Sequence, residues 1–229
     1  MMQDPIVLEA RNVSKTVPSP EGPLTILADV SLAVRAGETL AIVGASGAGK
    51  STLLALLAGL DSPSTGRVLI AGVDLTELDE DGRAEIRGRH VGFVFQSFHL
   101  IPSLTAVENV MLPLELSSRR DARAAAAQAL AQVGLTARAA HYPKQLSGGE
   151  QQRVAIARAF VTHPAVLFAD EPTGNLDTTT GLKITDLLFE LNRSIRSTLI
   201  LVTHDRGLAQ RCGRVLQLDA GHAMNRAPV

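Results

Sequence analysis

The chain of 229 residues is long enough for one large domain or for one core with a subdomain. A hydrophobic content of 45% provides for a buried core, and a formal net charge of −1 excludes an overall field that would attract nucleic acid or anionic lipid. The single cysteine, Cys212, excludes a disulfide within the chain, as expected in a reducing compartment.

The N-terminus gives no sign of a targeting segment. Residues 1–5 lack the basic and apolar stretches of a signal peptide, and no run approaches the roughly 18 apolar residues that span a bilayer. We therefore expect neither a signal peptide nor a membrane span, so any role at a membrane would come through a partner protein.

The N-terminal part of the chain is predicted to form strands joined by turns. Residues 15–23 contain three prolines and a glycine and predict a loop, and residues 36–38 predict a turn. Alternating or continuous apolar patterns predict four strands, at residues 6–13, 24–27, 30–34 and 39–43.

A glycine-rich loop follows the last of these strands and precedes a predicted helix at residues 52–58. It reads Gly44-Ala45-Ser46-Gly47-Ala48-Gly49-Lys50-Ser51 and matches the phosphate-loop pattern G-x-x-x-x-G-K-[ST]. A glycine-rich turn could fit the pattern by chance, but the flanking strand and helix are the context that the motif requires. The sequence therefore predicts a triphosphate site formed by this loop and Thr52.

The loop suits phosphate because each residue type has a part in binding. Gly44, Gly47 and Gly49 permit backbone angles and close approaches that a Cβ would forbid. Their N–H groups can then point at phosphate oxygens, together with the positive end of the following helix. Lys50 would reach the β- and γ-phosphates, and the Ser51 hydroxyl would bind Mg²⁺.

The rest of the chain alternates strands with helices, which predicts an α/β fold with a mostly parallel sheet covered on both faces. A helical insertion is expected over about residues 97–160, and the remaining residues, 1–96 and 161–229, would form the core. Strands are predicted at residues 67–70, 91–95, 165–169, 199–202 and 214–218, and helices at residues 83–89, 107–116, 121–133, 149–160 and 184–191.

A second glycine pair opens the helix that ends the insertion, in Leu146-Ser147-Gly148-Gly149-Glu150. Ser147 is a suitable N-cap, and the two glycines expose backbone N–H groups at a helix terminus, where an anion can bind. Taken alone, this segment could equally be an ordinary capped turn.

Three further polar segments follow predicted strands. Asp170-Glu171 ends a deeply apolar strand, at the edge where ligands bind in parallel sheets. Gln96 and His204 also end strands. Each of these residues could instead be an ordinary polar strand end.

These motifs together resemble those of the ATP-binding cassette (ABC) ATPases over nearly the whole chain and in the family's order. The resemblance rests on the phosphate loop, Gln96, the segment at residues 146–150, the segment at residues 166–171, Asn175-Leu176-Asp177 and His204. Residues 92–98, 100–110 and 171–177 are similar to the subgroup for lipoprotein release and macrolide export.

The resemblance implies a P-loop ABC cassette with an N-terminal antiparallel β subdomain. It also implies that Asp170 holds Mg²⁺ and that Glu171 accepts a proton from the water that attacks the γ-phosphate. Gln96 would meet both the metal and this water, and His204 would sense the γ-phosphate. Ser147, Gly148, Gly149 and Glu150 would cover the nucleotide of a second chain, and Asp177 would position that opposite site.

The expected assembly is a head-to-tail homodimer around two ATP molecules, bound to a transmembrane permease at the cytoplasmic face of the inner membrane. The segment 97–112 contains the apolar residues Phe98, Leu100, Ile101, Leu104 and Val107. Some of them are expected to pack in the core, and the others to form a groove for a short helix of this permease. The alternative is that all of them pack internally.

One position departs from the family's pattern. The aromatic residue that stacks on adenine is replaced by Val17, and the chain has one Tyr and no Trp. We therefore expect weak adenine selectivity.

Two functions remain open after this comparison. The leading hypothesis is a permease-bound ATPase that powers export or extraction of a lipophilic substrate. The alternative is a regulatory ATPase of a division-type membrane complex that moves no substrate. A DNA-repair ABC ATPase is disfavoured, because the chain has neither the heptads nor the paired cysteines of such insertions.

Overall fold

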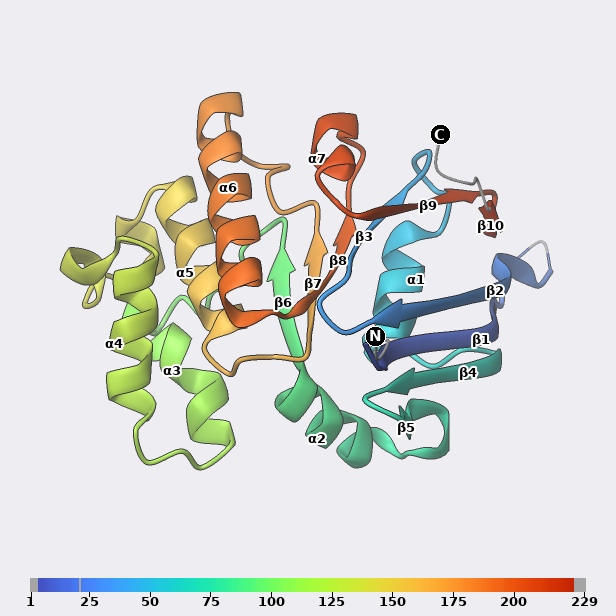
Figure 1. Cartoon of the computed structure of the whole chain (residues 1–229), viewed down its shortest axis with the longest axis horizontal. Helices are drawn as coiled ribbons and strands as arrows, with labels where there is room; N and C mark the ends of the chain where they lie inside the picture. The colour runs from blue at the N-terminus through green and yellow to red at the C-terminus, as the bar shows by residue number, and fades with distance from the viewer. Residues whose placement is uncertain (1–3, 21, 225–229) are drawn as a thin grey trace. The chain divides into compact units, whose positions relative to one another are not determined.

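A computed structural model describes residues 4–20 and 22–224, and Figure 1 shows the course of the chain. The chain divides into two compact units, which are described separately. Unit 1 comprises Met1–Arg87 and Thr198–Val229, and unit 2 comprises Gly88–Ser197. Residues 1–3, on which the expectation of no signal peptide partly rests, lie outside the described residues, as does residue 21 of the predicted loop. Over the described ranges, no helix is long and apolar enough to cross a membrane.

The first sheet of unit 1 is antiparallel, with strand order β2-β1-β4-β5 (Figure 1). Its inward positions, which include Leu8, Val13 and Leu27, are fully buried, as expected for a sheet with one face toward a core. The strands are β1 (Ile6–Val17), β2 (Leu24–Arg35), β4 (Thr65–Ile70) and β5 (Val73–Asp74).

Two sequence predictions in this sheet were wrong in detail. The predicted loop begins later, because Lys15, Thr16 and Val17 continue β1 and pair with β2. The two strands predicted at residues 24–27 and 30–34 are a single strand, β2. Asp29 lies between them with a φ of 51°, and its N–H donates to Ser14 Oγ at 3.0 Å. The left-handed backbone at Asp29 therefore does not interrupt β2.

The second sheet of unit 1 is built around β3 (Thr39–Val43), which pairs in parallel with β8 (Thr198–Val202) and β9 (Arg214–Asp219). A short strand, β10 (His222–Met224), returns antiparallel to β9. All five residues of β8 are buried, which explains its continuous apolar sequence.

Helix α1 (Lys50–Leu57) contacts β1, β2 and β4 of the antiparallel sheet and β8 of the parallel sheet, and therefore joins the two sheets of unit 1 (Figure 1). Its apolar residues Leu53, Leu56 and Leu57 are buried. Unit 1 also contains η1 (Leu75–Glu77), α7 (Arg206–Gln210) and most of α2 (Glu80–His90), which runs into unit 2.

Unit 2 joins a parallel strand pair to a group of helices. Strands β6 (Val91–Phe95) and β7 (Val166–Asp170) pair in parallel, and α5 packs against β6, α3, α4 and α6. The helices are α3 (Ala106–Leu116), α4 (Ala122–Gln132), α5 (Gly148–Phe160) and α6 (Thr178–Ile195), with short 3₁₀ turns η2 (Thr136–Arg138) and η3 (Pro143–Gln145).

The predicted α/β class is confirmed, and all predicted strands and helices are present, although two of the strands are joined as β2. Helix α6 begins before the predicted residue 184, because Asp177 caps it by accepting a hydrogen bond from Thr180 N at 3.0 Å. The sequence analysis missed β5, β10 and α7, which have at most five residues each.

Candidate functional site

The glycine-rich loop of unit 1 has the backbone geometry that phosphate binding needs. Gly47 and Gly49 have φ values of 77° and 95°, in the left-handed region that disfavours side chains. A Cβ on Gly44 would lie 2.2 Å from Leu218 O, so that position requires close approach. Gly49 is the N-cap of α1 and gives it no side-chain hydrogen bond. The first N–H groups of α1 therefore have no side-chain cap competing with a phosphate.

Lys50 lies over the loop itself. Its Nζ donates to Gly44 O at 3.0 Å and to Ala45 O at 2.9 Å. These neutral acceptors hold the ammonium group at the loop, where a phosphate oxygen would be a stronger, charge-assisted acceptor. Ser51, the next residue, is exposed and is therefore accessible to a ligand, whereas Ala48 is buried and packs against the protein.

His204 lies at a cavity of about 430 Å³ that also includes Gly44 and Ala45 of the phosphate loop. The neighbouring strands explain this placement: β3 and β8 run parallel, and Thr203 N donates to Ile42 O at 3.3 Å where they end. The structure thus brings His204 and the loop together within unit 1, as parallel strands with a shared carboxyl edge require.

The same cavity includes residues that the sequence analysis did not select, among them Arg206 and Gln210 of α7. Asp205 caps this helix by accepting hydrogen bonds from Gly207 N at 2.7 Å and Leu208 N at 3.2 Å. Arg206 supplies a cation beside a loop that is suited to anions. The only sequence signal for it was its position two residues after His204, just beyond the end of a predicted strand.

In unit 2, Asp170 is the last residue of β7, Glu171 follows it, and Gln96 follows β6. Phe95 pairs with Asp170 in the parallel ladder, so Gln96 and Glu171 leave neighbouring strands at the same level. Glu171 has a φ of 45°, and its carbonyl accepts a hydrogen bond from Gly174 N at 2.9 Å. The turn from Glu171 to Asp177 thus starts with a tight, hydrogen-bonded bend.

The predicted N-cap at Ser147 is present as a reciprocal capping box at the start of α5. Glu150 N donates to Ser147 Oγ at 3.3 Å, while Ser147 N and Oγ both donate to Glu150 Oε2 at 2.9 Å. Arg138 Nε also donates to Glu150 Oε1, at 3.1 Å. The backbone N–H of Ser147, then its hydroxyl, and more weakly Arg138 hold the pKa of Glu150 below its usual range.

The two glycines after Ser147 lie close to α6 and the turn before it. A Cβ on Gly149 would come within 2.7 Å of Thr180 Cγ2, and one on Gly148 within 3.4 Å of Leu176 Cδ2. The segment 147–150 thus packs beside the turn that carries Asp177. Hydrogen bonds from Thr180, with its side chain the larger contributor, lower the pKa of Asp177.

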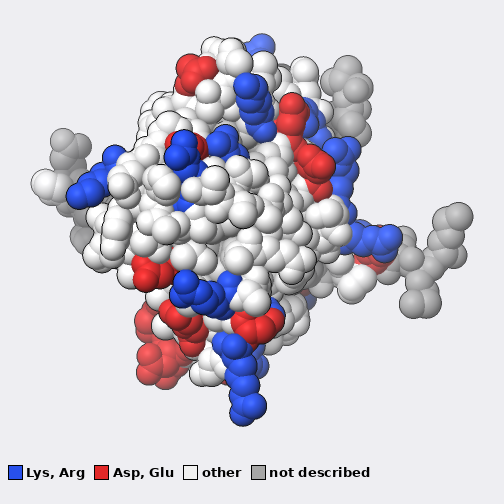
Figure 2. Space-filling model, turned by 90° about the vertical axis from the view of Figure 1, so that its left-hand side faces the viewer, with Lys and Arg blue, Asp and Glu red and all other residues white. Residues whose placement is uncertain are grey.

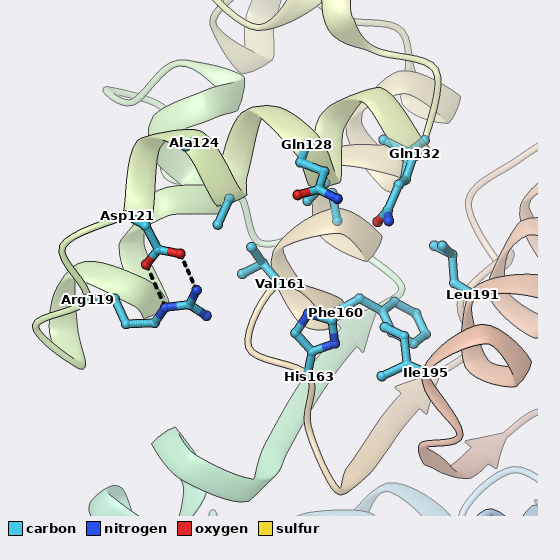
Figure 3. A pocket seen from close by; sticks show the side chains of 14 residues that line it. Arg119, Asp121, Ala124, Gln128, Gln132, Phe160, Val161, His163, Leu191 and Ile195 are labelled. Carbon is cyan, nitrogen blue, oxygen red and sulfur yellow. Dashed lines mark hydrogen bonds and ion pairs between the residues drawn. The ribbon is translucent and has the colours of Figure 1, made fainter.

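Figure 3 shows a separate cavity of unit 2, of about 230 Å³. Gln128 and Gln132 of α4 face two residues across this cavity: Phe160, the last residue of α5, and His163, which follows that helix. The Arg119–Asp121 ion pair lies at its edge, with Arg119 Nε donating to Asp121 Oδ1 at 2.9 Å. The residues that line this cavity include none of the predicted site residues.

The predicted site residues therefore fall into two sets. Unit 1 holds the phosphate loop, Thr52 and His204, whereas unit 2 holds Gln96, Asp170, Glu171, the segment 147–150 and Asp177. Each set is brought together within its own unit. Their catalytic and binding roles stay predictions.

A family model described as ABC transporter matches residues 27–174. YbbA of Escherichia coli strain K12, an uncharacterized ABC transporter ATP-binding protein whose motifs this chain resembles, is 56% identical over 96% of this chain and 98% of YbbA. The lipoprotein-releasing system ATP-binding protein LolD of Xanthomonas campestris pv. campestris strain 8004 is 48% identical over 99% of this chain and 95% of LolD.

Among solved structures, the ATP-binding cassette MJ0796 is similar to this chain with a TM-score of 0.88 and 42% sequence identity. The match covers 95% of this chain and 97% of MJ0796, whose structure is a dimer in a post-hydrolysis state bound to ADP and Pi.

Proposed function

Because the chain belongs to the ABC transporter family, as an ATP-binding cassette that hydrolyses ATP, we propose that it powers export or extraction of a lipophilic substrate by a membrane complex. The observation that carries this proposal is the full-length similarity to LolD, a lipoprotein-releasing ATP-binding protein. The complex would contain a transmembrane permease, and this chain would lie at the cytoplasmic face of the inner membrane through that partner.

The chain's own residues would divide the chemistry between binding and proton transfer. Lys50 and the loop N–H groups would bind the phosphates, and His204 would contact the γ-phosphate from the neighbouring strand end. Glu171 would accept the proton of the attacking water. Such positioned charges supply most of the catalysis in phosphoryl transfer.

The residues proposed to hold Mg²⁺ fit that ion by the chemistry of their donor atoms. Ser51, Gln96 and Asp170 offer hydroxyl, amide and carboxylate oxygens, the ligands that Mg²⁺ prefers. Bound there, Mg²⁺ would neutralise charge on the phosphates. Among the described residues there is no group of three or more His, Cys, Asp or Glu that would compete as a metal site.

A second copy of the chain would complete each nucleotide site. Ser147, Gly148 and Gly149 of one copy would cover the phosphates bound by the other, and Asp177 would position the opposite site. The dimeric form of MJ0796 supports this arrangement. ATP bound between two copies would favour the closed dimer through its greater affinity for that state, and hydrolysis would open it. We further propose that residues 97–160 act as a helical subdomain in this cycle.

The residue at the predicted adenine position is aliphatic. Val17 ends β1, is partly exposed and pairs with Leu24. Base–aromatic stacking contributes roughly 1–3 kcal/mol, so its lack should weaken ATP binding about five- to a hundredfold. We expect similar affinities for ATP and GTP in a binding titration, and tighter ATP binding by Val17→Tyr. A strong preference of the unchanged chain for ATP would contradict this expectation.

An exposed groove of unit 2 suits the predicted partner contact. It is a cavity of about 330 Å³ lined by Phe93, Phe95, His99, Leu112 and Leu116, among others. The side chain of Leu116 is 79% exposed. From the segment 97–112, His99 and Leu112 line this cavity, whereas none of the apolar residues predicted to contribute does so: Phe98, Leu100, Ile101, Leu104 and Val107.

The groove is held in shape without a partner. The rings of Phe93 and Phe95 stack with centroids 5.3 Å apart, and Phe95 lies 4.7 Å from the His99 ring. Arg158 donates from Nη1 to His99 O at 2.7 Å and from Nη2 to Phe98 O at 2.9 Å. Its burial lowers the pKa of this guanidinium, which still carries its charge at neutral pH. A preformed apolar groove of this kind supports docking of a short amphipathic helix from the permease.

Replacing Leu116 by Glu tests this contact. Losing the burial of one leucine costs about 1.5–3 kcal/mol, so we expect permease binding to weaken about ten- to a hundredfold. Co-purification of the tagged chain with membranes measures the binding, and ATP hydrolysis by the isolated chain should not change. Leu24→Glu is the matched control, because Leu24 is 55% exposed and does not line the groove. Equal retention of both variants on membranes would exclude the groove as the contact.

Regulation of a division-type membrane complex is the alternative function. It would use the same hydrolytic residues, so the identity of the membrane subunit is needed to distinguish the regulatory function from transport. Identifying the subunit that co-elutes with the tagged chain, and testing whether ATP hydrolysis displaces a lipophilic substrate from it, would distinguish them. Hydrolysis that releases no substrate would favour the regulatory role.

Nucleic acid is not a proposed partner. Figure 2 shows one face of the molecule, on which Lys and Arg side chains are interspersed with Asp and Glu around a large uncharged area. Mixed signs on this face support the expectation from the net charge of −1, since nucleic-acid binding relies on a coherent basic surface.

A further inference from the structure

Two hydrogen bonds join Asn175 to Gln96, a residue 79 positions earlier in the chain. Gln96 Nε2 donates to Asn175 Oδ1 at 3.2 Å, and Asn175 Nδ2 donates to the backbone carbonyl of Gln96 at 3.1 Å. Both residues belong to unit 2. One side-chain amide therefore holds both the backbone and the side chain of Gln96.

This pair of bonds determines which end of the Gln96 amide remains available. A backbone carbonyl can only accept, so Asn175 must present Nδ2 to Gln96 O. Asn175 Oδ1 then faces the Gln96 side chain and requires a donor, which is Nε2. Reversing either amide would place two donors or two acceptors against each other. The two hydrogen bonds to Asn175 therefore leave Oε1 as the end of the Gln96 amide that is available to another ligand.

The neighbouring glycine permits this close fit. A Cβ on Gly174 would come within 2.7 Å of Gln96 Nε2 and 3.0 Å of its Cδ. The backbone of Gly174 is not in the left-handed region, so the glycine is needed here for space and not for its backbone angles. The Gln96 side chain thus lies directly against the turn that carries Glu171 and Asp177.

A second amide holds the same two segments from the side of α5. Gln152 is fully buried, and its Nε2 donates to Pro172 O at 2.5 Å, with a longer contact of 3.5 Å to Phe95 O. Its Oε1 has no hydrogen-bond partner in the part of the chain that the structure describes. Burying an unpaired oxygen is costly, and the same side chain holds the residue before Gln96 and the residue after Glu171.

We propose that Asn175 is a positioning residue for Gln96. By accepting the amide N–H of Gln96, it keeps Oε1 as the atom offered to the metal ion of the bound nucleotide. An amide oxygen is a suitable Mg²⁺ ligand, whereas an amide nitrogen is not. The inference rests on the proposed function, in which Gln96 is a metal ligand, and it adds the residue that orients this ligand.

Mn²⁺ provides a direct probe, because its electron paramagnetic resonance signal reports metal binding without catalysis. Mn²⁺ is titrated into the full chain with a non-hydrolysable ATP analogue, the chain being in excess over the nucleotide. The variants are Asn175→Ala, Gly174→Ala and Gln96→Ala. Gln128→Ala is the control, because Gln128 is an exposed glutamine on α4 outside the site.

We expect Asn175→Ala and Gly174→Ala each to weaken Mn²⁺ binding about three- to tenfold, the effect of losing one or two net hydrogen bonds. Gln96→Ala should weaken it at least as much, and Gln128→Ala should not change it. Adding Asn175→Ala to Gln96→Ala should have no further effect, because Asn175 acts through Gln96. Both Gly174 and Asn175 are exposed, so thermal unfolding should stay near that of the unchanged chain.

Two results would overturn the proposal in distinguishable ways. If Gln96→Ala weakens Mn²⁺ binding and Asn175→Ala leaves it within about twofold, Asn175 does not position Gln96, while the metal role of Gln96 stands. If Gln96→Ala itself has no effect, Gln96 is not a metal ligand, and the proposal fails together with that part of the proposed function. Additive effects in the double variant would also contradict the proposal.

Discussion

Replacing Glu171 by Gln is expected to lower kcat by about 10²- to 10⁴-fold, the usual contribution of a positioned general base. The amide has nearly the same size and shape as the carboxylate but cannot accept a proton from water. The backbone bend at Glu171, with its φ of 45° and the hydrogen bond from Gly174 N, does not depend on the side chain. ATP binding and dimer closure should therefore persist while turnover falls to this residual rate.

Two measurements on the Glu171→Gln variant separate these effects. Phosphate release reports turnover, and size-exclusion chromatography with light scattering reports whether ATP holds two copies together. Glu190→Gln is the matched control, because Glu190 is an exposed glutamate of α6 with no proposed role. Hydrolysis at the unchanged rate in Glu171→Gln would remove Glu171 from its assigned role, whereas loss of ATP binding would indicate that the substitution disturbs the site itself.

Replacing Lys50 by Ala should weaken ATP binding by about a hundredfold or more. A hydrogen bond to a charged group contributes roughly 1.5–3 kcal/mol, and the Lys50 ammonium would make such bonds to two phosphates. In the structure its Nζ already lies at the loop, within 3.0 Å of Gly44 O and 2.9 Å of Ala45 O. Little rearrangement is needed for it to meet phosphate, so the full loss should appear in binding.

Calorimetric titration with ATP measures this loss in the single chain. Lys183→Ala removes an equally charged but exposed lysine of α6 and should bind ATP like the unchanged chain. A thermal melt without nucleotide should show that Lys50→Ala is folded, since its partners are carbonyls that water can also satisfy. Unchanged ATP affinity in a folded Lys50→Ala variant would exclude this loop as the main phosphate site.

The local parts of the site followed from the sequence because their signals are local. The phosphate loop lies within eight consecutive residues, and its glycines have the backbone angles and close approaches that their spacing predicted. The cap at Ser147 needs only Glu150 three residues later, so it too could be predicted. Buried parallel strands such as β7 and β8 were found from continuous apolar runs.

Other features depended on partners far away in the sequence. Prolines after residue 17 suggested that β1 ends early, but pairing with β2 extends it to Val17. The start of α6 was missed because its first turn lacks apolar periodicity, although Asp177 caps it. Arg206 reaches the cavity of the phosphate loop only because β3 and β8 end side by side.

The sequence by itself determined the family, the order of the elements and the residues that could bind phosphate, because these depend on short motifs and on apolar periodicity. Only the tertiary structure showed that Asn175 forms two hydrogen bonds with Gln96 and that Gln152 contacts both Phe95 and Pro172. It alone also showed that Leu112 and Leu116 line a groove with Phe93. The physical reason is that hydrogen-bond direction and groove shape arise between segments separated by many residues. Local pattern carries no information about such distances or about which end of an amide faces its partner.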